Sequence, residues 1–97
     1  MMLDSQYMTR VRDDILLKAF ADVLRSLRSE IGISQEQLAL RANVDRTFVS
    51  KLESARHQPS LAVVFKLSQA LGTTPEKLIA LVRASQDSVE QTPAKVG

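Results

Sequence analysis

Residues 35–52, QEQLALRANVDRTFVSKL, decide the fold of this chain. Apolar residues recur at helical spacing on both sides of Asn43, which predicts one short helix before this residue and another after it. The first runs from Gln35 to about Ala42, and the second follows Asp45, a good N-cap, to Glu53 or Ser54. Two short helices joined by a three-residue turn must cross steeply and pack closely.

The residues in and around this turn meet four requirements of such a crossing. Ala39 is the small residue that close contact needs, and Asn43 tolerates left-handed backbone better than most residues. Val44 is the apolar plug beneath the turn. Val49 and Leu52 give the second helix its apolar face. Together these features are typical of a helix-turn-helix motif, although two-helix hairpins are common and a purely structural role remains open.

Three more helices are expected around the motif. Upstream, an apolar face predicts a helix that ends at Gly32, and three earlier apolar residues allow it to begin near Thr9. These positions are Phe20, Val23, Leu24, Leu27 and Ile31, preceded by Ile15, Leu16 and Leu17. Ser34 and Gln37 form a capping box for the helix that begins at Gln35.

The two downstream helices have clear start signals. Ser60 caps a fourth helix, which Gly72 ends. Thr74 as cap and Pro75 at the first helical position begin a fifth, which extends to about Ser85. The apolar rows are Leu61, Val64, Leu67 and Leu71 in the fourth helix, and Leu78, Ile79, Leu81 and Val82 in the fifth.

The chain therefore reads as one all-α domain of five helices. Residues 1–12 are an N-terminal arm or the start of an extended first helix. Residues 13–85 form the domain, with the helix-turn-helix at 35–53. Residues 86–97 are polar and lack periodicity, which predicts a disordered tail.

Composition excludes several classes of function. The chain of 97 residues has no cysteine, so disulfides, thiolate zinc sites and cysteine nucleophiles are excluded. A single histidine is poor support for a metal site. The sequence also lacks a convergent carboxylate motif that would indicate an enzyme. We expect no cofactor, no metal and no membrane segment, and a cytoplasmic location. The net charge of +2 is uninformative, but Arg41, Arg46, Lys51 and Arg56 concentrate positive charge around the second helix of the motif.

Residues 20–81 resemble the phage repressor/Cro-like (XRE-type) helix-turn-helix family. The likeness rests on Ile33-Ser34-Gln35, Leu38-Ala39, Val49-Ser50, Leu52-Glu53, Pro59-Ser60-Leu61 and Ala70-Leu71-Gly72. It implies a five-helix lambda-repressor-like domain whose third helix reads the major groove of double-stranded DNA. VDRTFVSKLE is similar to the restriction–modification controller proteins within this family.

The sequence departs from the family pattern at two positions usually held by glycine. Asn43 should be tolerated in the turn. Ala55 follows the third helix, and if this position needs positive φ, alanine costs about 1 kcal/mol.

Val49 and Leu52 are expected to face the core. Helix periodicity then turns outward the side chains of the first turn of this helix and the two side chains between Val49 and Leu52. The base-reading candidates are Arg46, Thr47, Ser50 and Lys51. Arg46 lies in the first turn, where its fork can donate two hydrogen bonds to guanine. A solvated arginine is the alternative.

A second set of residues is expected to contact phosphate. The candidates are Ser34, Gln35, Arg56 and Gln58. Gln35 begins its helix, so its N–H, its amide and the helix dipole can all favour an anion. The resemblance implies the same anchoring role, whereas Ser34 could serve as a cap only.

The resemblance also implies that Arg28 pairs with Glu53 and orients the third helix. We expect Arg28→Ala to weaken DNA binding without abolishing folding. The apolar stripe of Leu78, Ile79, Leu81 and Val82 suggests a two-fold dimer contact, with ordinary packing as the alternative. A homodimer predicts a pseudo-palindromic operator with half-sites about one helical turn apart.

The sequence thus predicts a sequence-specific transcriptional regulator acting as a repressor or autoregulator. The alternative is a protein-interaction module of the same fold, such as an antitoxin. Arg46 and Lys51 on the outer face of the third helix oppose that alternative.

Overall fold

The computed structural model describes the backbone of residues 4–91 and the side chains of residues 13–89. All regular elements in this part of the chain are α-helices, and it contains no strand, as predicted. The elements are α1 (Asp4–Ile31), α2 (Gln35–Ala42), α3 (Arg46–Glu53), α4 (Leu61–Ala70) and α5 (Pro75–Gln91).

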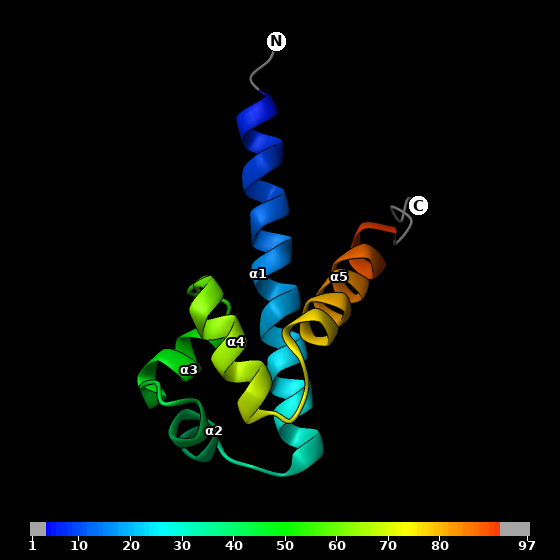
Figure 1. Cartoon of the computed structure of the whole chain (residues 1–97). Helices are drawn as coiled ribbons and strands as arrows, with labels where there is room; N and C mark the ends of the chain where they lie inside the picture. The colour runs from blue at the N-terminus through cyan, green and yellow to red at the C-terminus, as the bar shows by residue number, and fades with distance from the viewer. Residues whose placement is uncertain (1–3, 92–97) are drawn as a thin grey trace.

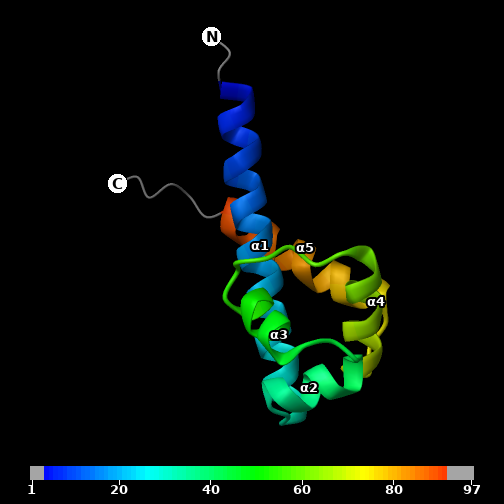
Figure 2. The same cartoon turned by 90° about the vertical axis from the view of Figure 1, so that its left-hand side faces the viewer.

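The long helix α1 is the spine of the molecule (Figure 1). It packs against α5 on one side and against α3 on another, while α2 contacts α3 and α4. The first turns of α1 project beyond the other helices in both views (Figures 1 and 2). The helix-turn-helix formed by α2 and α3 therefore lies at the end of α1 that is farther from its N-terminus.

The core joins all five helices. Each contributes residues with no exposed surface or nearly none, because its apolar positions repeat on one side. The most deeply buried large side chains are Leu24, Leu38, Val49, Leu52, Leu67 and Leu78. Val44 and Phe48 pack against this core from the turn and from α3.

The helix starts follow the predicted caps in three of four cases. The Ser34 hydroxyl accepts a hydrogen bond from the Gln37 N–H at 3.0 Å, and the Gln37 side chain accepts from the Ser34 N–H at 2.9 Å. Ser60 and Thr74 cap α4 and α5 in the same way. Asp45 precedes α3, but its carboxylate accepts no capping hydrogen bond.

One boundary follows an alternative that the sequence left open, and one differs from the prediction. α1 begins at Asp4, so residues 4–12 are the start of an extended first helix rather than an arm. α5 continues to Gln91, and the disordered tail predicted from Gln86 is wrong for residues 86–91. The added turns carry an Arg83–Asp87 ion pair and place Val89 beside α1. Residues 92–97 lie outside the described part.

The predicted dimer stripe on α5 is also corrected. Leu78 and Val82 are buried within the subunit, because α5 packs between α1 and α4 and completes the core. Neither is available to a second subunit. Ile79 and Leu81 remain exposed, at 48% and 44%. None of the described helices is apolar enough over sufficient length to span a bilayer.

Candidate nucleic-acid interface

The two faces of α3 divide as the periodicity requires. Val49 and Leu52 have no exposed surface. On the opposite face Arg46 and Thr47 are exposed, and Ser50 and Lys51 are partly exposed. The structure therefore brings the four predicted base-reading residues to one outer surface.

Positive charge on this surface is not used internally. Among the described residues, no ion pair involves Arg41, Arg46, Lys51 or Arg56. Charges of one sign without internal partners attract an anionic ligand. The surface can therefore meet a phosphate backbone without first breaking ion pairs of its own.

The turn that sets the angle of α3 has the left-handed residue that the sequence predicts. Asn43 has φ 57° and ψ 49°. The N–H of Val44 donates to the Ala39 carbonyl at 3.0 Å, which closes the end of α2. Half-buried Val44 then fills the space beneath the turn.

An ion pair beneath α3 joins it to α1. The Arg28 guanidinium donates to both carboxylate oxygens of Glu53, at 2.6 and 2.9 Å, and to the Ile33 carbonyl at 2.8 Å. Glu53 is only 3% exposed. The hydrogen bonds to Glu53 raise the pKa of Arg28 above its ordinary value, outweighing desolvation by burial, so Arg28 stays charged.

Gln35 belongs to the same cluster. Its amide nitrogen donates to a Glu53 carboxylate oxygen at 2.9 Å. The sequence predicted that this amide donates to phosphate, but one of its two hydrogens is already bound to Glu53 within the subunit. The backbone N–H of Gln35 and the second hydrogen of its amide have no acceptor among the described residues, so both can donate to a phosphate. Ser34 is occupied as a cap.

The loop after α3 contains a strained residue. Ala55 has φ 61°, in the region that favours glycine. This turn allows the Arg56 N–H to donate to the Lys51 carbonyl at 2.9 Å. The side chains of Arg56 and Gln58, both predicted phosphate contacts, are exposed after it.

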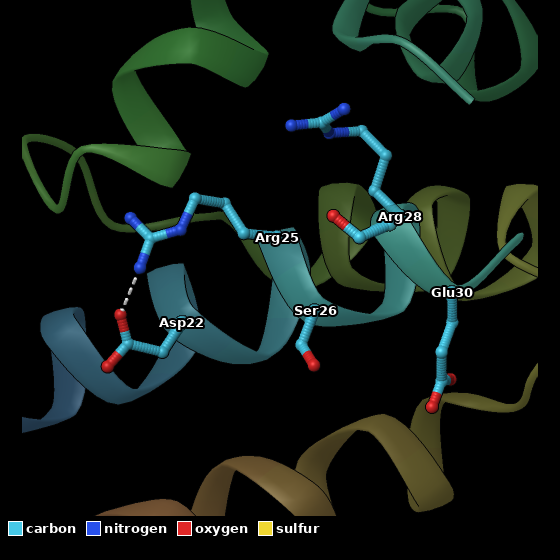
Figure 3. A pocket seen from close by; sticks show the side chains of 6 residues that line it. Asp22, Arg25, Ser26, Arg28 and Glu30 are labelled. Atoms are coloured by element: carbon cyan, nitrogen blue, oxygen red, sulfur yellow. Dashed lines mark hydrogen bonds and ion pairs between the residues drawn. The ribbon is translucent and has the colours of Figure 1, made fainter. Parts of the chain in front are cut away.

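Sequence reasoning missed two residues of this region. Phe48 lies edge-on to His57, with ring centroids 6.0 Å apart, and so ties the loop to α3. Arg25 lines an open depression on α1 with Asp22, Arg28 and three neighbours (Figure 3). The spacing of Arg25 and Arg28, three residues apart on a helix, could have indicated a shared face.

Comparison with known proteins agrees with this geometry. The helix-turn-helix family profile matches residues 24–78. The chain belongs to this family, in its XRE-type branch. Within it, the chain is 35% identical over 69 residues to the control protein C.MunI of Mycoplasma sp, covering 70% of this chain and 92% of that protein.

Two solved structures extend the comparison. The restriction–modification controller protein C.AhdI of Aeromonas hydrophila is 39% identical, with a TM-score of 0.62, over 64% of this chain and 94% of that one. A variant of C.Esp1396I bound to its highest-affinity operator site is 25% identical, with a TM-score of 0.69, over 74% of this chain and 95% of that one.

Proposed function

We propose that this protein is a homodimeric transcriptional regulator of the controller type that binds a specific double-stranded DNA operator. The observation that carries the proposal is the outer face of α3, where Arg46 and Lys51 make no ion pair within the described part of the chain, while the Arg28–Glu53 pair ties the helix to α1. The likeness to control proteins, one of them bound to its operator, supports it.

In this proposal α3 enters the major groove. Arg46, Thr47, Ser50 and Lys51 meet base edges, and Arg46 discriminates guanine by about 1–3 kcal/mol. The α2 N-terminus and the Arg56–Gln58 loop hold the phosphate backbone. Occupancy of the operator represses or autoregulates transcription, and the protein acts in the cytoplasm without catalysis.

The test selects bound sites from random duplex DNA. We expect a pseudo-palindromic sequence with half-sites about one helical turn apart. Arg46→Ala should relax preference at one position in each half-site and lower operator affinity roughly tenfold, with an unchanged melting temperature. Lys77→Ala, an equal charge change at an exposed position on α5, is the control. Unchanged preference in Arg46→Ala would remove the base-reading role.

The surface between α4 and α5 is the face that we propose for the dimer. Leu61, Phe65 and Ile79 are 75%, 54% and 48% exposed and line one groove. Glu76 and Arg83 also line the groove, and a two-fold axis would bring opposite charges together there. A contiguous exposed apolar patch with charged neighbours is typical of a protein interface.

Replacing the aromatic residue that lines this groove tests the dimer. Phe65→Glu should yield a folded monomer in sedimentation at micromolar concentration and lower operator affinity by more than tenfold, because two half-sites no longer bind together. Leu40→Glu, at another exposed apolar position, on α2, should remain dimeric. A dimeric Phe65→Glu variant would place the interface elsewhere.

A further inference from the structure

A second arginine connects α1 to α3, separately from the Arg28–Glu53 pair. One nitrogen of the Arg25 guanidinium donates to the backbone carbonyl of Glu53 at 3.1 Å. The other terminal nitrogen binds the Asp22 carboxylate, which lies 3.4 Å from the Lys18 ammonium. Figure 3 shows Arg25 and Arg28 leaving α1 on the same side, with Arg25 joined to Asp22.

The carbonyl that Arg25 reaches is the last one of α3. The three carbonyls before it accept from backbone N–H groups of the following loop: Ser50 from Ser54, Lys51 from Arg56, and Leu52 from Ala55. Among the described residues, Arg25 supplies the hydrogen bond to the Glu53 carbonyl. A cation at a helix C-terminus also interacts favourably with the helix dipole.

Glu53 is thus held at two points from one face of α1. Arg28 fixes its carboxylate and Arg25 fixes its carbonyl. The buried Val49 and Leu52 hold the inner face of α3 against the core. Two separated attachments at its carboxyl end further restrict its rotation and its tilt. The loop that carries Arg56 and Gln58 starts at the second attachment.

Arg25 is half exposed, with 49% of its side chain accessible, so a phosphate contact is the alternative role. Two observations oppose it. Both terminal nitrogens already have partners in the subunit, and the Asp22 carboxylate balances the charge. Binding phosphate through these two N–H groups would break both bonds, and the remaining N–H groups could meet a phosphate only close to the negatively charged Asp22 carboxylate.

We propose that Arg25 is a positioning residue, held by Asp22, that sets the angle of α3 and the path of the loop after it. The proposal rests on the proposed operator binding. It predicts that Arg25 contributes to operator preference without touching DNA.

The experiment measures affinity for the selected operator duplex and for an unrelated duplex across a range of salt concentrations. Arg25→Ala should weaken operator binding about tenfold and leave binding to the unrelated duplex unchanged. The salt dependence should stay the same, because an arginine that binds phosphate contributes about 0.9 to the logarithmic slope and Arg25 contributes nothing. Lys77→Ala, which removes an exposed positive charge on α5 outside the proposed dimer groove, should change neither affinity.

A second variant covers the case in which Arg25→Ala folds poorly. Asp22→Asn retains Arg25 and weakens its hold, and should reduce operator affinity about threefold with the salt slope unchanged. Equally weakened binding to both duplexes with a shallower slope would identify Arg25 as a phosphate ligand and overturn the proposal.

The two proposals fail in distinguishable ways. If the unmodified protein prefers no sequence, the proposed function fails and the positioning role fails with it. If the unmodified protein prefers its operator and both Arg25→Ala and Asp22→Asn retain full affinity, only the positioning role is overturned.

Discussion

The carboxyl end of α3 is fixed by side chains of Arg25, Arg28 and Gln35, whereas its amino end has no side-chain cap. The fixed end is buried at Glu53, and the free end exposes Arg46 and Thr47. A helix that must hold one orientation while its first turn meets a ligand benefits from this division. Polar groups satisfied inside the subunit orient α3, and those left unsatisfied are available for binding.

The largest effect is expected from breaking the fixed end. Arg28→Ala leaves the Glu53 carboxylate buried without its cation, which should destabilise the fold by about 3 kcal/mol and reduce operator affinity. Thermal and urea unfolding measure the change, with Lys77→Ala as an exposed-charge control outside the proposed dimer groove that changes stability by less than about 0.5 kcal/mol. A destabilisation in Arg28→Ala no larger than in this control would contradict the comparison.

A double variant separates orientation from stability in the same pair. Replacing both partners, Arg28→Met with Glu53→Leu, removes the buried charges together and should recover most of the stability. Operator preference should not recover if the pair orients α3.

A smaller effect of opposite sign is expected just beyond the fixed end. Ala55→Gly relieves the positive φ and should stabilise the fold by about 1 kcal/mol, or roughly 5 °C in melting temperature. Ala62→Gly in α4 is the control and should destabilise the fold, because glycine in a helix is less favourable than alanine and Ala62 has no positive φ to relieve. A neutral or destabilising Ala55→Gly would mean that the loop holds no strain there.

The smallest effect is expected at the free end. Asp45→Ala should cost only a few tenths of a kcal/mol, because the carboxylate makes no capping hydrogen bond and contributes only through the helix dipole. Ser34→Ala, which removes the capping hydroxyl of α2, should cost about 1 kcal/mol. Equal costs in urea unfolding would show that the two starts are capped alike.

The sequence predicts much of the fold because its signals are local. The Ser34–Gln37 box, the left-handed Asn43 and the glycines after α1 and α4 act within a few residues. The outward face of α3 follows from Val49 and Leu52 by periodicity alone. Helix ends without such signals are predicted less accurately, as at α5, where a polar stretch continues as helix to Gln91 and no local residue marks the end.

Features that depend on distant parts of the chain are harder to predict. Leu78 and Val82 look like a surplus stripe until α5 is placed between α1 and α4. The bond from Gln35 to Glu53 and that from Arg25 to the Glu53 carbonyl need coordinates, since nothing local marks them. The Arg28–Glu53 pair is predicted only through family resemblance.

The position of α1 between α3 and α5 has a consequence for the operator itself. In the proposed dimer, α1 of each subunit links α3 to α5, which forms part of the dimer face. The distance between the two α3 helices is therefore set by the protein. One added base pair turns a half-site by about 35° around the duplex axis, and the two subunits could not both follow. The length of the DNA between the half-sites then contributes to operator specificity, as do the bases that Arg46 contacts.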